Sequence, residues 1–256
     1  CKVLGKTPPS GFAYELFLDE KGEKISKSKG NGISIDEWLN YASPESLSLY
    51  MFQNPKRAKK LYSDVVPKAV DEYLSLIEKF PEQKEKDQLS NPVWHIHNGE
   101  PPKEKIVMSF SMLLNLVGSS NTDDKRILWK FINRFHKDVK PESNPILDSL
   151  TEHAIKFFKD KLKPNKIYKK PNDQEKKALI NLANHIEKIN DNMPPEEIQT
   201  IVYSVGKENG YEKNLRDWFK LIYQVLFGDI DGPRMGFFVS FFGVKETVKL
   251  IKDKIN

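Results

Sequence analysis

Residues 106–120, IVMSFSMLLNLVGSS, carry apolar side chains at the spacing of an α-helix. The apolar positions are Ile106, Phe110, Leu113, Leu114 and Val117. Residues 121–135, NTDDKRILWKFINRF, repeat the pattern, and Thr122 with the aspartates after it forms a suitable N-terminal cap. The second set of apolar positions is Ile127, Leu128, Phe131, Ile132 and Phe135. Residues three and four apart share one helix face, so these segments predict two amphipathic helices.

The same spacing continues towards the end of the chain. It predicts further helices at residues 147–162, 174–189, 195–209, 214–227 and 244–255. Prolines and glycines separate these segments, and no repeat of fixed period is present. The pattern therefore predicts an irregular helical bundle.

The first 80 residues have a mixed pattern. Residues 14–18 alternate like a strand, and residues 19–23 supply a turn. Ser34 is the expected cap of a helix at 35–41, and Ser43 with Pro44 begins another. Residues 61–66 predict a short strand, and a helix is expected from Pro67 towards Phe80.

Residues 81–90 are almost entirely polar and predict a linker or surface turn. We therefore expect a mainly α protein with two parts. A small mixed α/β segment covers residues 1–80, and an all-helical bundle covers residues 81–256.

Composition limits the classes of protein that need to be considered. No run of about 18 apolar residues is present, which argues against a membrane span or a membrane partner. Cys1 is the only cysteine, so neither an internal disulfide framework nor a cysteine-rich zinc site is expected. No secretory signal is recognisable, and the abrupt start resembles a cut inside a larger protein. We expect a cytoplasmic monomer without a bound metal.

Positive charge is concentrated in one window. Residues 156–177 hold nine lysines and three acidic residues, whereas the whole chain has a net charge of +5. Such a patch suits contacts with nucleic-acid phosphates, which release counterions on binding. From composition alone, a solvated helix end and linker is the more common explanation.

The sequence Lys24-Ile25-Ser26-Lys27-Ser28-Lys29-Gly30-Asn31-Gly32 combines cations, hydroxyls and glycines in one loop. Lysine ammonium groups can stabilise charge that develops on a leaving pyrophosphate. From residue types alone, however, this pattern is more typical of a solvated surface loop.

The first five residues of this loop resemble the lysine-methionine-serine-lysine-serine signature of class I aminoacyl-tRNA synthetases, with Ile25 in place of methionine. The resemblance implies that the loop binds ATP phosphates and stabilises the adenylation transition state. Lys27 matches the lysine usually given that role, with Lys24 and Ser28 in support. Ser26 and Gly30 are implied as further phosphate contacts.

A longer stretch resembles the class I lysyl-tRNA synthetases specifically. The matching segments are NGISIDEWL at 31–39, PESL at 44–47, AKKL at 58–61, DVVP at 64–67 and DGPRMGFF at 231–238. The resemblance implies lysine, ATP with Mg²⁺, and tRNA(Lys) as the substrates of the complete enzyme. It also implies that residues 1–80 contact the acceptor stem and that residues 81–256 form a helix cage that binds the anticodon.

Candidate RNA contacts follow from this division. We expect Lys56, Arg57 and Lys60 to contact the acceptor stem. In the helical part, the candidates are Lys163, Lys166, Lys169, Lys170 and Arg234. Arg234 lies between Gly232-Pro233 and Gly236, which predicts a constrained turn. The nearby aromatic residues are either base-stacking groups or core residues, and helical spacing favours the core.

The second class I signature, histidine-x-glycine-histidine, is not found upstream of Lys24. His95-Ile96-His97 lies downstream and lacks the glycine, so we expect these histidines to be packed or surface residues. The nucleotide-binding domain with the lysine pocket is therefore expected to be absent, leaving the chain inactive alone. Two alternatives stay open: part of another class I synthetase, glutamyl-like in architecture, and a freestanding RNA-binding helical module.

Overall fold

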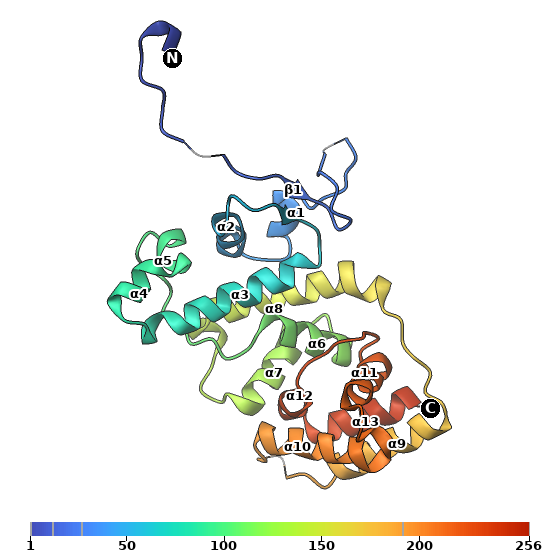
Figure 1. Ribbon diagram of the computed structural model, residues 1–256. Helices are drawn as coiled ribbons and strands as arrows, with labels where there is room; N and C mark the ends of the chain where they lie inside the picture. The colour runs from blue at the N-terminus through green and yellow to red at the C-terminus, as the bar shows by residue number, and fades with distance from the viewer. Residues whose placement is uncertain (1, 12, 27, 191, 256) are drawn as a thin grey trace. The chain divides into compact units, whose positions relative to one another are not determined.

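A computed structural model describes residues 2–11, 13–26, 28–190 and 192–255. It is mainly helical, which confirms the predicted fold class, and one small sheet lies among the described residues (Figure 1). The chain divides into two compact units, Cys1–Pro102 and Lys103–Asn256. We call them unit 1 and unit 2. No helix in the described residues is long and apolar enough to cross a membrane.

The sheet in unit 1 joins two short strands that are distant in sequence. Strand β1 (Phe17–Leu18) pairs in parallel with β2 (Lys59–Lys60), and Leu18 also bridges to Lys24 in the antiparallel sense. The predicted strand at 14–18 thus keeps only its last two residues. The predicted strand at 61–66 is wrong, because Val65 already begins α3 and presents its apolar residues along a helical face.

The helices of unit 1 confirm both predicted serine caps. They are η1 (Lys2–Leu4), α1 (Ile35–Leu39), α2 (Pro44–Phe52), α3 (Val65–Lys79), η2 (Phe80–Glu82), α4 (Glu85–Ser90) and α5 (Pro92–Ile96). The Ser34 hydroxyl accepts from the Glu37 amide at 3.1 Å, and Ser43 does the same for Ser46 at 3.3 Å. Between them Trp38 is fully buried, and its Nε1 donates to Ser46 Oγ at 3.2 Å.

The polar stretch at 81–90 is partly helical. Asn91, which is 3% exposed, holds this region in place: its Nδ2 donates to the Leu76 carbonyl at 3.2 Å and to Gln83 Oε1 at 2.8 Å. Because α5 packs against α2 and α3, the compact unit extends to Pro102, beyond the expected boundary at residue 80.

Unit 2 contains helices near all the predicted positions. They are α6 (Phe110–Ser120), α7 (Lys125–Phe135), η3 (Pro141–Ser143), α8 (Pro145–Phe157), η4 (Phe158–Leu162), η5 (Lys163–Asn165), α9 (Asp173–Ile186), α10 (Pro195–Gly206), η6 (Lys207–Tyr211), α11 (Leu215–Leu226), α12 (Met235–Phe242) and α13 (Val244–Ile255). Helix α6 starts at Phe110, capped by Ser109, so Ile106 lies before it. Asp124, rather than Thr122, caps α7 directly.

Helix α12 is absent from the predicted helices, although it lies at the centre of the bundle. Its sequence MGFFVSFF is apolar around most of its circumference, so it has no amphipathic periodicity to detect. It packs on α10, where the Gly236 amide donates to Gln199 Oε1 at 2.9 Å. This bond sets the start of α12, and with it the position of the loop before it.

Candidate functional site

The lysine–serine loop is held at its base by the side chain of Asn31. Its Nδ2 donates to Asp19 Oδ2 at 2.7 Å and to the Lys24 carbonyl at 3.3 Å, and its Oδ1 accepts from the Ser26 amide at 3.0 Å. One amide therefore ties both ends of the segment 24–26 to Asp19, the residue that follows β1. We call this arrangement the Asn31 clasp.

Asp19 anchors the clasp to the turn after β1. Its Oδ1 accepts from the Glu23 amide at 2.8 Å, and the two backbones also bond, Asp19 N to Glu23 O at 2.8 Å. The hydrogen bond from Asn31 lowers the pKa of the Asp19 carboxyl, and the backbone amides of the turn act in the same direction. The carboxylate is therefore the form that holds the loop.

The outer part of the loop is exposed and polar. Lys24, Ser28 and Gly30 are exposed, and Ser26 Oγ lies 2.8 Å from Ser28 Oγ. Lys29 makes a surface ion pair with Glu23, at 3.4 Å. Lys27, the residue predicted to matter most, lies outside the described residues. Lys24 and Ser28 are both exposed, and a lysine ammonium and a serine hydroxyl are groups that can donate hydrogen bonds to a phosphate.

Ile25 is half-buried and makes the apolar contact at the base of the loop. A Cβ on Gly32 would lie 2.7 Å from Ile25 Cδ1, so only glycine lets the backbone approach this closely without displacing the side chain. The amide of Asn31 and the apolar contact of Ile25 thus hold the base of the loop, while Lys24 and Lys29 are exposed.

The predicted acceptor-stem cations lie beside the same sheet. Lys56 and Arg57 are exposed, and Lys60 donates to the Glu20 carbonyl at 2.8 Å. Their neighbour Lys59 is different: it donates to the Tyr50 and Met51 carbonyls at the end of α2, and burial lowers its pKa. Lys59 is therefore a helix-capping residue in the structure.

The lysines predicted in unit 2 do not form one uniform patch. Lys166 is largely buried and pairs with Asp229 at 3.2 Å, and Lys169 pairs with Glu175 at 2.6 Å. Lys163 donates to Asn121 Oδ1 at 3.1 Å, and Lys170 is exposed. A lysine already neutralised by a carboxylate is a weaker phosphate ligand, so Lys163 and Lys170 are the more available pair.

Arg234 lies in a constrained turn, as predicted. The Tyr223 hydroxyl donates to the Pro233 carbonyl at 3.0 Å, and the backbone of Gly232 packs directly on the Tyr223 ring. Any side chain at residue 232 would collide with that ring. Burial raises the pKa of Tyr223 to about 12, so its hydroxyl remains a donor. Exposed Arg234 lies with its guanidinium 5.7 Å from the centre of the Phe237 ring.

The aromatic residues of the same region divide into core and surface groups. Trp218 and Phe238 are fully buried, and Trp218 Nε1 donates to the Val202 carbonyl at 2.9 Å. Phe219 and Phe237 are only half-buried. Tyr203, which the sequence did not single out, is 40% exposed.

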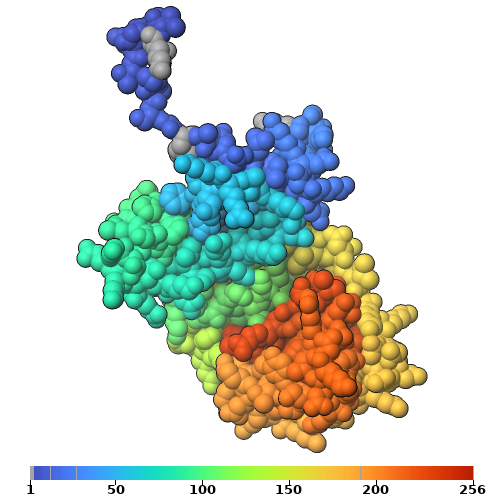
Figure 2. Space-filling view, viewed as in Figure 1, coloured from blue at the N-terminus to red at the C-terminus, as the bar shows by residue number. Residues whose placement is uncertain are grey.

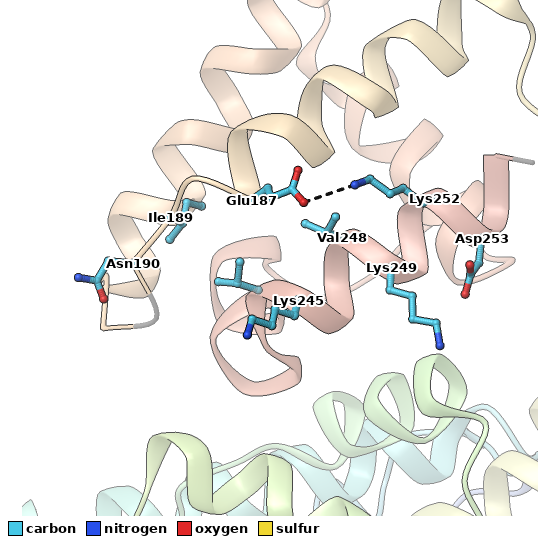
Figure 3. Close-up of a pocket in the computed structure, with 9 residues that line it drawn as sticks. Glu187, Ile189, Asn190, Lys245, Val248, Lys249, Lys252 and Asp253 are labelled. Atoms are coloured by element: carbon cyan, nitrogen blue, oxygen red, sulfur yellow. Dashed lines mark hydrogen bonds and ion pairs between the residues drawn. The ribbon is translucent and has the colours of Figure 1, made fainter.

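A hollow of about 640 Å³ lies between the end of α9 and α13 (Figure 3). Lys245, Lys249 and Lys252 line it, but so do Glu187 and Asp253, and Lys252 lies 3.5 Å from Glu187. Because these charges nearly balance, the hollow is a poor site for a phosphate.

Of the two histidines, which were expected to be packed or surface residues, His97 is half-buried and His95 is exposed. The Nε2 of His97 lies 3.0 Å from the Tyr73 hydroxyl, and burial lowers the pKa of this histidine. His95 stacks on Phe52 and bonds to the Leu89 carbonyl at 2.9 Å.

Comparison with known proteins gives one matching family model and several similar curated proteins. The family model for class I lysine tRNA synthetases matches residues 1–100. The lysine–tRNA ligase of Roseobacter denitrificans is 48% identical over 98% of this chain and 47% of its own length. Those of Rickettsia bellii and Rickettsia felis are each 46% identical over 100% of this chain and 49% of their own length. The chain thus spans about half the length of the curated relatives it matches.

Proposed function

We propose that this chain is the C-terminal part of a class I lysyl-tRNA synthetase, which as a complete enzyme uses ATP to attach lysine to tRNA(Lys). The observation that carries the proposal is the lysine–serine loop on its Asn31 clasp, which lies inside the segment matched by the family model. The homologues named lysine–tRNA ligase favour this function over a glutamyl-like one.

In this proposal the loop acts on the phosphates of ATP. Lys24 and Lys27 stabilise negative charge on the pyrophosphate as it leaves, and Ser28 donates a hydrogen bond to it. Ser26 and Gly30 contact the phosphates in the ground state. The exposed ammonium of Lys24 and the neighbouring hydroxyls suit a polyanion.

Mg²⁺ accompanies ATP in this family, but we assign it no protein ligand in this chain. Among the described residues, no group of three or more histidine, cysteine or acidic side chains is placed to hold a metal ion. We therefore expect the ion to be held by ATP and by the part of the enzyme outside this chain.

Unit 1 and unit 2 are proposed to contact different parts of tRNA(Lys). Lys56, Arg57 and Lys60 serve the acceptor stem. Unit 2 serves the anticodon, with Lys163 and Lys170 on phosphates and Arg234 on a base edge. Lys166 and Lys169 contribute only if RNA displaces their carboxylate partners. We place the complete enzyme in the cytoplasm, as a monomer.

Two measurements test this proposal. The purified chain should bind a tRNA transcript with the lysine anticodon, yet show no lysine-dependent exchange of pyrophosphate into ATP. Fused to the preceding half of the Roseobacter denitrificans enzyme, it should regain exchange, and Lys24→Ala should reduce it. Exchange by the isolated chain, or failure to bind tRNA, would contradict the proposal.

A further inference from the structure

Helices α10 and α11 together present two aromatic rings at the surface of unit 2. Tyr203 on α10 is 40% exposed, and its ring centre lies 5.0 Å from that of half-buried Phe219 on α11, at an interplanar angle of 71°. The helices are joined beneath these rings, where Trp218 donates to the Val202 carbonyl. In Figure 2 the orange atoms of this part of the chain form much of the visible face of unit 2.

The two rings are linked by packing contacts to the turn that holds Arg234. Phe219 lies 6.1 Å from Tyr223, whose hydroxyl holds the Pro233 carbonyl. On α10, Tyr203 follows Gln199 by one helical turn, and Gln199 fixes the first turn of α12 through Gly236. The exposed ring and the constrained arginine are therefore set by the same packed elements rather than by flexible segments.

Three cations lie close in sequence to the two aromatic residues, along with the acidic residues Glu208 and Asp217. Lys207 follows Tyr203 by four residues, Arg216 precedes Phe219 by three, and Lys220 is next to Phe219. All three are exposed, and no ion pair is found for them among the described residues. This distinguishes the surface from the Lys166 and Lys169 region, where carboxylates already occupy the ammonium groups.

We propose that Tyr203 and Phe219 form a stacking site for one unpaired base of a single-stranded RNA loop, with Lys207 and Arg216 beside the flanking phosphates. Bases in RNA loops are bound by stacking on aromatic rings, and basic side chains beside the rings hold the backbone. The inference rests on the proposed tRNA function of unit 2, and it adds a specific base-binding group that Arg234 alone does not supply.

The test uses the full chain and a hairpin RNA with the anticodon stem and loop of tRNA(Lys), with 2-aminopurine at one loop position at a time. Tyr203→Ala should weaken binding about 5- to 150-fold, the range measured for loss of one base–aromatic stack. It should also abolish the fluorescence change at a single loop position. Tyr203→Phe keeps the ring and should bind as the unmodified chain does.

The matched control is Ile180→Ala, which removes another exposed apolar side chain, 46% exposed, from α9 of the same unit. It should leave binding unchanged, and circular dichroism should show all variants folded. If the unmodified chain binds the hairpin but Tyr203→Ala binds equally well, the stacking site is overturned while the proposed function stands. If the unmodified chain does not bind the hairpin at all, both fail.

Discussion

Two loops carry the proposed functions of this chain, and they are held in different ways. The lysine–serine loop of unit 1 depends on the polar Asn31 clasp and on the contact between Gly32 and half-exposed Ile25. The Arg234 turn of unit 2 packs Gly232 on the ring of Tyr223, which is anchored at its hydroxyl. The clasp can exchange its bonds with water, whereas the aromatic contact cannot move without repacking the bundle. These supports suit the proposed roles, in which the first loop closes over a nucleotide and the second turn presents a fixed side chain.

The largest effect is expected from the lysine–serine loop, in the rate of adenylate formation. In the complete enzyme, Lys27→Ala should raise the barrier to lysyl-adenylate formation by about 3 kcal/mol, because the ammonium acts on the developing pyrophosphate. Lysine affinity should change much less. Pre-steady-state adenylation rates measure this effect, and an unchanged rate would remove Lys27 from the mechanism.

The next largest effect is expected at the Arg234 turn, in the free energy of unfolding. Gly232→Ala forces a methyl group into the Tyr223 ring and should lower the free energy of unfolding by about 1–3 kcal/mol. Gly32→Ala meets Ile25 Cδ1 at 2.7 Å and Cγ2 at 2.8 Å, and it should cost less because the half-exposed Ile25 side chain can turn towards solvent. Gly11→Ala, with no atom within 4 Å of the added Cβ, is the neutral control. Urea unfolding measures all three, and equal losses at residues 32 and 232 would remove the distinction between the loops.

RNA binding should distinguish the proposed role of Arg234 from that of Lys163 and Lys170. Arg234→Ala should weaken binding of tRNA with the lysine anticodon by about 1–3 kcal/mol more than binding of tRNA with a changed anticodon. Neutralising Lys163 and Lys170 together should weaken both tRNAs equally and flatten the salt dependence. Titrations across a salt series decide this. Equal losses for both tRNAs after Arg234→Ala would assign that residue to phosphate or structure.

The smallest effect is the pH response of the clasp. Asp19 has a lowered pKa, so the stabilisation that it gives is present above its unfolded pKa and is lost as pH falls through the folded value. The amide resonances of Glu23 and Ser26 should therefore stay constant from pH 7 to about pH 4, the ordinary range for aspartate, and shift together below it. Asp19→Asn should remove this transition. A shift near pH 6 would point to another group.

The sequence predicted what depends on local patterns. Serine caps at Ser34 and Ser43 and the amphipathic helices of unit 2 follow from spacing alone, and the class of the lysine–serine loop followed from its signature. Helix α12 was missed because a helix buried on most sides has no polar face. The carboxylate partners of Lys166 and Lys169 were also missed: Asp229 is distant in sequence, and Glu175 was counted only as opposing charge.

The Asn31 clasp could not be predicted from the sequence, for a similar reason. Asp19 lies in what the sequence presents as an ordinary turn, and only the fold brings it to Asn31. Tyr203 was likewise overlooked, because one tyrosine on a helix gives no sign of whether it faces solvent or the core. Residue types near a motif suggested candidates, but pairing and exposure decided which of them are available.

The residue after Asn31 is Gly32, which has no side chain to hinder attack of its backbone nitrogen on the Asn31 side-chain amide, the step that releases ammonia in deamidation. Deamidation would replace Nδ2, now 2.7 Å from Asp19 Oδ2, with a carboxylate oxygen. Two carboxylates at that distance repel each other, so the clasp would open from within. The lifetime of the loop would then be set by the hydrolysis of one side chain. Mass spectrometry of stored protein, with Asn31→Asp as the reference, would measure the rate of this deamidation.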